Sequence, residues 1–152
     1  MDDCTRKTQS ATPLIRWRIQ SDNASLLRID SRCYLDSLTA VDLNTMLRDN
    51  RVIADVAEDR GNVLGYCIYQ LRPRVIKILR MGVDTIERRN GIATAFLERL
   101  KSKLGKHDRD TIVMDTPGVS LAAQLCLAKA GFVAEPRPND MIRFTFDLEV
   151  DE

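Results

Sequence analysis

Two arginines, an asparagine and a glycine stand directly before an expected helix, in the segment Arg88–Ala93. Apolar residues at Ile92, Phe96 and Leu100 then recur at helical spacing. The first turn of a helix has backbone N–H groups without intrahelical partners, and the helix dipole makes that end positive. Together with two guanidinium groups, these N–H groups suit a phosphate or a diphosphate. The sequence therefore predicts an anion-binding turn at residues 88–93.

Residue periodicity predicts the elements that must position this turn. Alternating apolar and polar residues predict strands, and apolar residues three or four apart predict helices. The expected order is a strand, two helices, three strands, a helix, a strand, a helix and two strands. This order is typical of a single α/β domain on a mixed sheet. The expected strands cover 15–19, 52–57, 63–71, 75–83, 111–115, 132–133 and 141–148, and the helices begin near 21, 39, 92 and 119.

Local polar residues predict several boundaries between these elements. Ser21 or Asp22 is expected to cap the first helix. Thr39, followed by Asp42, has the spacing of a capping box. Two loops are expected, Tyr34–Leu38 before that cap and 136–140 between the last two strands.

Composition limits the class of protein. The chain has 152 residues, of which 44% are hydrophobic and 30% charged, as in an ordinary folded domain. Because 23 basic residues nearly balance 22 acidic ones, we expect no nucleic-acid partner. No apolar run approaches the length of a membrane span, and the N-terminus lacks the apolar block of a signal peptide. We expect a cytoplasmic protein with no membrane partner, a mobile tail at 1–13 and one domain at 14–150.

The cysteines and the single histidine predict no metal site. Cys4, Cys33, Cys67 and Cys126 lack the spacing of metal ligands or of a redox motif. Three of them have apolar neighbours, where a reduced thiol packs as a small core residue, and we expect Cys126 to do so. His107 lies in a polar break at 105–110 and is expected to be a solvated loop residue.

The motifs and their order resemble the GNAT superfamily of acyl-CoA-dependent N-acyltransferases. The family loop is Gln or Arg, two residues, Gly, one residue, then Gly or Ala, and Arg88–Ala93 matches it in full. The strand ending at Val83 and a later helix ending in Gly131-Phe132 extend the likeness to residues 14–148. The segment 27–34 and the helix capped by Thr39 are most similar to protein N-terminal acetyltransferases, including those that modify ribosomal-protein alanine. The resemblance implies a GNAT-like domain with a mixed, mostly antiparallel sheet of about seven strands and about four flanking helices.

The resemblance also implies where acetyl-CoA binds. The backbone amides of the Arg89–Thr94 segment would hold the CoA pyrophosphate, and Gly91 would allow close approach of the backbone. The preceding strand would pair with the pantetheine arm, and the N–H of Val83 would polarise the thioester carbonyl, as an oxyanion hole does. The implied donor-binding residues are Met81, Val83, Arg88, Arg89, Asn90, Gly91, Ile92, Ala93, Thr94 and Ser120.

The catalytic positions of the family are only partly kept. In the N-terminal acetyltransferases a Glu acts as base, and a Tyr just before Gly-Phe protonates the departing thiolate. The matching positions are Asp115 and Leu127. Asp115 is the expected catalytic residue, acting through a water; alternatively it is a strand-end residue that starts the turn at Pro117. Leu127 has no proton to donate, so the resemblance implies slow or substrate-assisted catalysis.

The implied chemistry requires an amine as acceptor, but the sequence does not identify which amine. We expect an amine-bearing peptide, protein N-terminus or small molecule, held between the two loops with Tyr34 and Asp36 as substrate-binding residues. A small-molecule amine acetyltransferase differs only in the acceptor. A non-catalytic CoA-binding or interaction domain with the same fold is the alternative that Leu127 and Asp115 favour. Either would be a monomer or a homodimer.

Overall fold

A computed structural model describes residues 13–85, 91–118 and 121–148 of the chain. Its seven strands form one sheet in the order β1-β2-β3-β4-β5-β7-β6. Neighbouring strands are antiparallel except β4 and β5, which are parallel. The strands are β1 (Leu14–Trp17), β2 (Val52–Asp59), β3 (Asn62–Arg72), β4 (Val75–Val83), β5 (Thr111–Pro117), β6 (Val133–Arg137) and β7 (Met141–Asp147). The helices are η1 (Gln20–Asp22), α2 (Asn23–Cys33), α3 (Ala40–Arg48), α4 (Ile92–Lys101) and α5 (Leu121–Lys129).

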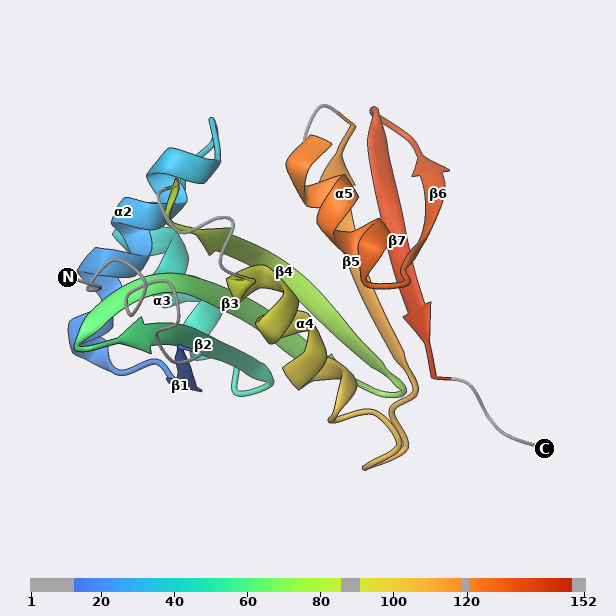
Figure 1. The fold of residues 1–152 in the computed structure, drawn as a ribbon, viewed down its shortest axis with the longest axis horizontal. Coiled ribbons are helices and arrows are strands. Elements are labelled where there is room, and N and C mark those ends of the chain that lie inside the picture. Colours follow the sequence, from blue (N-terminus) through green and yellow to red (C-terminus); the bar gives the residue numbers. More distant parts are fainter. Residues whose placement is uncertain (1–12, 86–90, 119–120, 149–152) are drawn as a thin grey trace, which may run out of the picture.

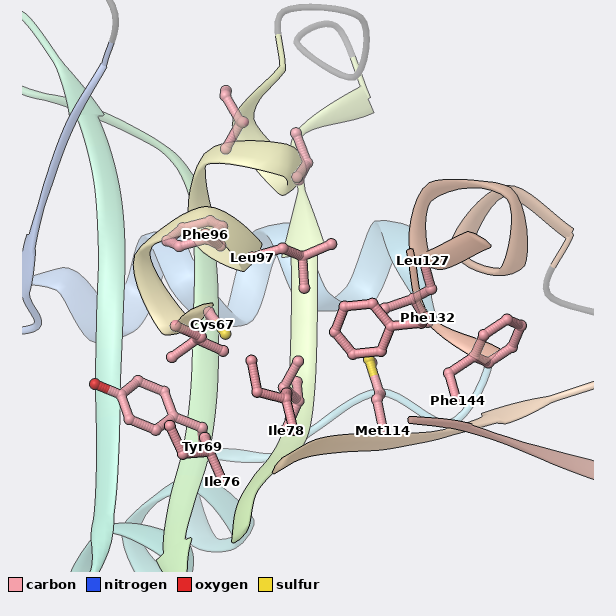
Figure 2. Packing of buried hydrophobic residues seen from close by; sticks show 14 of the residues in the cluster. Cys67, Tyr69, Ile76, Ile78, Phe96, Leu97, Met114, Leu127, Phe132 and Phe144 are labelled. Carbon is pink, nitrogen blue, oxygen red and sulfur yellow. The ribbon is translucent and has the colours of Figure 1, made fainter. Parts of the chain in front are cut away.

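Helices cover both faces of the sheet, so side chains alternate along each strand between two cores. Helices α2 and α3 lie on one face, and α4 and α5 lie on the other (Figure 1). Under α4 and α5, Phe96 and Leu97 pack onto the strands near Ile78, while Leu127 lies beside Phe132 (Figure 2). The smaller core on the opposite face contains Leu26, Ile29, Leu43, Val56, Tyr66 and Ile68. The predicted fold, a mostly antiparallel sheet of seven strands with four flanking α-helices, is confirmed.

Two of the predicted helix caps have different outcomes. The capping box of α3 is confirmed, because the Asp42 N–H donates to Thr39 Oγ1 at 3.0 Å and the Thr39 N–H donates to Asp42 Oδ2 at 3.2 Å. The cap predicted for α2 is wrong. The Asp22 carboxylate instead accepts from the Ile19 N–H and pairs with Arg16, both at 2.8 Å, because the short helix η1 precedes α2.

The last hairpin is tighter than the sequence predicted. Pro136 and Arg137, expected in a loop, belong to β6 and pair with Ile142 and Met141. The turn is short because Asn139 and Asp140 both adopt positive φ, at 63° and 58°. Proline is tolerated here because β6 is an edge strand, where one missing N–H donor need not break the sheet. The predicted tail (1–13) and the end of the predicted domain (149–150) fall outside the described residues, apart from Pro13.

The feature that positions the site is the divergence of β4 from β5. The two strands pair only where Val75–Ile78 faces Thr111–Met114. Beyond that point β4 continues to Val83 and β5 to Pro117 without pairing, and Figure 1 shows them separating toward one end. The half of β4 next to this gap therefore has backbone groups that no strand on that side satisfies.

Candidate active site

A cleft opens where β4 leaves β5. Its cavity has a volume of about 230 Å³ and lies between the end of β4, the start of α4, one face of α5 and the end of α2. Its walls are mostly small or apolar side chains: Cys33, Tyr34, Met81, Gly82, Val83, Ala93, Ala122, Ala123 and Cys126. Small side chains leave room for a ligand to lie against the backbone.

The backbone of β4 points its polar groups into this cleft at every second residue. The Asp84 N–H donates to the Leu64 carbonyl at 2.8 Å, so the next pair, Gly65 with Val83, is the non-hydrogen-bonded kind. The N–H and C=O of Val83 therefore point away from β3. Two side chains of the α2 end confirm this direction, because Tyr34 Oη donates to the Met81 carbonyl at 2.8 Å and Cys33 Sγ donates to the Val83 carbonyl at 3.4 Å.

The start of α4 presents further N–H donors beside the cleft. Its first internal hydrogen bond runs from the Ala95 N–H to the Gly91 carbonyl at 2.9 Å, so the N–H groups of residues 92–94 have no intrahelical acceptor. No side chain of a described residue caps this helix, since its N-cap residue is Gly91. Gly91 adopts φ 76°, a left-handed conformation that favours glycine, and a Cβ there would meet no atom within 4 Å. Of the sequence-predicted turn, residues 88–90 lie outside the described residues, as does Ser120.

One wall of the cleft is held by a buried carboxylate that sequence reasoning missed. Asp30 on α2 is fully buried and accepts from Arg80 Nε at 2.8 Å and Nη2 at 3.0 Å. It also accepts from the Leu38 N–H at 2.7 Å and from the Tyr66 hydroxyl. Burial alone would raise the pKa of Asp30, but these hydrogen bonds together hold it below its usual value. Asp30 thus fixes the loop after α2 to β3 and β4.

Arg80 extends this network to the predicted substrate-binding residues. Its guanidinium carbon lies 3.9 Å from the centroid of the Tyr34 ring, and Nη2 donates to the Asp36 carbonyl. Tyr34 lines the cleft, whereas the side chain of Asp36 is exposed and only its backbone meets the network. A sequence signal for Asp30 was present, since this charged residue lies four residues after Leu26 on the apolar face of the expected helix.

The model of the Acetyltransferase (GNAT) family matches residues 18–132, which is most of the chain. The chain belongs to the GNAT acetyltransferase family. No curated protein matches the sequence.

Solved structures with the same fold include several N-terminal acetyltransferases. The ribosomal-protein-S18-alanine N-acetyltransferase from Escherichia coli is 17% identical, with a TM-score of 0.78 over 91% of this chain and 96% of its own. Ard1 from Thermoplasma volcanium is 18% identical, with a TM-score of 0.78 over 92% and 100%. NAA60 from Arabidopsis thaliana, solved with a bisubstrate analogue, is 15% identical, with a TM-score of 0.74 over 90% and 98%. At these identities the likeness shows the GNAT fold.

Asp115, the base expected from the sequence, is engaged in an ion pair. Asp115 accepts from Arg143 Nε at 2.8 Å and from Nη2 at 3.0 Å, across the β5–β7 ladder. Hydrogen bonding to Arg143 lowers the pKa of Asp115. Asp115 is not among the residues lining the cleft, because its neighbours Met114 and Thr116 are the β5 side chains buried on the α5 side. Its alternative role, starting the turn at Pro117, is not seen, since the carboxylate bonds across the sheet.

Leu127, which the sequence matched to the acid position, is buried, and its neighbour Cys126 lines the cleft. Leu127 is fully buried and points into the core beside Phe132 (Figure 2). Cys126 packs against the core under α4 and α5, as expected, but it does not face away from the cleft. It lines the cleft with Ala122 and Ala123, which lie on the same face of α5. Burial raises the pKa of the Cys126 thiol, against smaller lowering effects of nearby polar groups, so the thiol stays protonated near neutral pH. The fully buried thiol of the described chain is Cys67.

Two further properties bear on function. Among the described residues, no group of three His, Cys, Asp or Glu side chains could hold a metal ion. No helix in the described ranges is long and apolar enough to cross a membrane.

Proposed function

We propose that the protein transfers an acetyl group from acetyl-CoA to a primary amine, and that a protein N-terminal α-amine is its acceptor. The observation that carries this proposal is the cleft between β4 and α5. There the N–H of Val83 and the uncapped start of α4 open into one space, lined by small side chains. The N–H groups of residues 92–94 would bind the CoA pyrophosphate, with Arg88 and Arg89 adding positive charge.

The reaction needs one bond to form and one to break. The amine nitrogen attacks the thioester carbonyl carbon and the C–S bond breaks. The amine gives its proton to water, and the CoA thiolate takes a proton from a donor in the cleft that water then reprotonates. The cleft-facing N–H of Val83 would donate to the carbonyl oxygen as negative charge develops there. A single donor of this kind contributes on the order of a hundredfold to the rate.

The weak base at Asp115 favours an α-amine over a lysine amine. An α-amine titrates near 7.7–8.0, so roughly a tenth is neutral at pH 7. A lysine amine near 10.4 must lose its proton at a cost of about 4.6 kcal/mol. Because Arg143 holds Asp115 in its ionised form with a lowered pKa, an acceptor that is already partly neutral suits this site better.

Three proton-bearing side chains line the cleft, and two of them, Cys33 and Tyr34, already donate to carbonyls of β4. Cys126 is therefore the proton donor that we propose in place of the missing tyrosine. Its thiol lines the same cavity as Met81 and Val83, and its pKa is raised, so the proton is present at neutral pH. We expect Cys126→Ala to lower kcat, and Cys126→Ser to lower it as much because a hydroxyl is a far weaker acid.

The experiment that tests the proposal is a turnover screen with acetyl-CoA. Peptides with different first residues are compared with lysine peptides, whose α-amine is blocked, and with polyamines. Turnover of free α-amines with little turnover of lysine peptides supports the proposal. If acetyl-CoA neither binds nor raises the melting temperature, the proposal fails.

A second function is favoured by Leu127 and the Asp115–Arg143 pair. Both observations fit a domain that binds CoA and catalyses no transfer. Tight CoA binding without turnover of any amine would establish it. Where turnover is measured, Asp115→Asn tests whether this carboxylate is the base. We expect a loss smaller than tenfold, whereas a loss of about a hundredfold would make Asp115 the base.

A further inference from the structure

A second cavity lies at the opposite end of α4 from the cleft. Its volume is about 290 Å³, and it shares no lining residue with the cleft. The ends of β2, β3 and β4 supply an apolar floor, and the segment after α4 supplies a basic rim. The floor residues are Ile53, Tyr69, Leu71 and Ile76, and the rim residues are Lys103, Lys106, His107 and Arg109.

The basic rim forms no salt bridge in the part of the chain that the structure describes. The acidic group that interacts with it is the buried Asp55, whose pKa is raised by burial and lowered in part by the charge of Lys103. Lys103 and Lys106 make no salt bridge there. Arg109 Nε donates to the Arg72 carbonyl at 2.9 Å, which leaves its charge uncompensated. The nearby carboxylate of Asp110 is already paired with Arg74. Favourable interaction with the C-terminal helix dipole accounts for basic residues in the last turn of α4, but that effect fades within one turn and does not reach Lys106 or Arg109.

The floor of the cavity contains a polar group without a partner. Tyr69 is fully buried, and its hydroxyl makes no hydrogen bond within the described residues. Figure 2 shows this hydroxyl pointing away from the rest of the hydrophobic cluster. The polar group beside it is the Asp55 carboxylate. It interacts with the Tyr69 hydroxyl strongly enough to shift the pKa of each group, but Oδ1 of Asp55 and the hydroxyl do not reach hydrogen-bond geometry. An unsatisfied buried polar group costs about 1–3 kcal/mol, so a ligand atom that accepts from Tyr69 would relieve a cost already present.

We propose that this cavity binds a small amphipathic anion, with a carboxylate or phosphate group at the basic rim and a short apolar body on the floor. The head group would lie between Lys103 and Lys106, within reach of the Tyr69 hydroxyl. The apolar body would cover Ile53 and Leu71. This site is separate from the proposed acetyl transfer, so it stands or fails independently of it.

The test is a titration of the full chain followed by backbone amide shifts in NMR. Hexanoate is the probe for a carboxylate on an apolar body, hexanamide is its neutral match, and inorganic phosphate is the head group alone. We expect saturable shifts from hexanoate in residues 103–109 and 69–71, with none in 81–83 or 122–126. Hexanamide and phosphate should each bind at least about tenfold more weakly, a difference of 1.4 kcal/mol. Equal binding of either control, or the absence of saturable shifts, overturns the proposal.

Variants locate the ligand. Lys103→Met and Lys106→Met should each weaken hexanoate binding about tenfold or more, and added salt should weaken it in the parent protein. Tyr69→Phe should weaken hexanoate binding about threefold, because one neutral hydrogen bond is lost. The control is Arg60→Met in the β2–β3 turn, which removes an equal charge from an exposed position and should change nothing. Unchanged affinity in the lysine variants would show that the shifts arise elsewhere and would refute the site.

Discussion

Two buried aspartates on opposite faces of the sheet show how differently one fold can treat the same group. Asp30, on the buried face of α2, accepts from Arg80, Tyr66 and the Leu38 N–H. Asp55, under α4, accepts from Arg99 Nε at 3.2 Å, and its Oδ1 has no partner among the described residues. Their pKa values move in opposite directions, because burial raises that of Asp55 while the hydrogen bonds of Asp30 outweigh its burial.

The difference in hydrogen bonding between the two carboxylates shows which contacts hold the cleft in place. A buried carboxylate stabilises a fold only when its oxygen atoms are fully hydrogen-bonded, since desolvation otherwise exceeds the gain from pairing. Asp30 meets that condition and ties α2, β3, β4 and the following loop into one unit beside Tyr34. Asp55 does not meet it, and its charge interacts with Lys103 and Tyr69, two residues that line the second cavity. The satisfied carboxylate is the one next to the proposed donor site.

The largest expected effect comes from breaking the Asp30 network. Arg80→Met leaves the fully buried Asp30 without its charged partner, and we expect the free energy of unfolding to fall by about 3 kcal/mol. Chemical denaturation measures this loss. Arg74→Met is the matched control because it also removes one arginine from an aspartate pair, but at a side chain that is 70% exposed. Its expected cost is below about 1 kcal/mol. If the two variants lost equal unfolding free energy, removal of Arg80 would not leave Asp30 as an uncompensated buried charge.

A smaller effect separates the two tyrosines beside these aspartates. Tyr66→Phe removes a donor from Asp30 and should destabilise the fold by about 1–2 kcal/mol. Tyr69→Phe removes a hydroxyl that has no partner within the described residues, so it should leave stability unchanged or raise it. Both rings are fully buried and both variants delete one oxygen atom, so each serves as the other's control. Thermal melts of the two variants check the expected order, and a reversed order would contradict the comparison.

The fold followed from local signals that tertiary contacts did not override. The Thr39–Asp42 cap, the β2–β3 hairpin and the amphipathic α4 each depend on residues close in sequence. The end of the last hairpin was misplaced because Pro136 suggests a loop, whereas edge-strand pairing with β7 accommodates it. Local residue preference and long-range pairing disagree there.

The site was predicted less well because its decisive contacts join distant residues. Arg143, which pairs with Asp115, is 28 residues away in sequence, and Arg80 is 50 residues from Asp30. The orientation of α5 likewise depends on packing over the sheet, and this brings Cys126 rather than Leu127 into the cleft. Helical spacing alone relates side chains to one another and does not say which face meets the sheet.

The last and smallest effect is a pH dependence of opposite sign at the two aspartates. The pKa of Asp30 is lowered on folding, so its contribution to stability is complete above about pH 3.9, the unfolded value, and is lost as the pH falls through the folded value. The pKa of Asp55 is raised, so its carboxyl binds a proton more readily when folded, and stability decreases as the pH rises above about 3.9.

Asp55→Asn should therefore abolish this loss of stability at higher pH. The variant should be neutral or slightly stabilising at pH 7, with less effect at pH 4. Asp30→Asn should be destabilising at pH 7, because an amide adds N–H donors where Arg80 and Leu38 already donate. Denaturation curves of both variants across this pH range give the comparison, and parallel profiles would show that the two carboxylates are not in opposite environments.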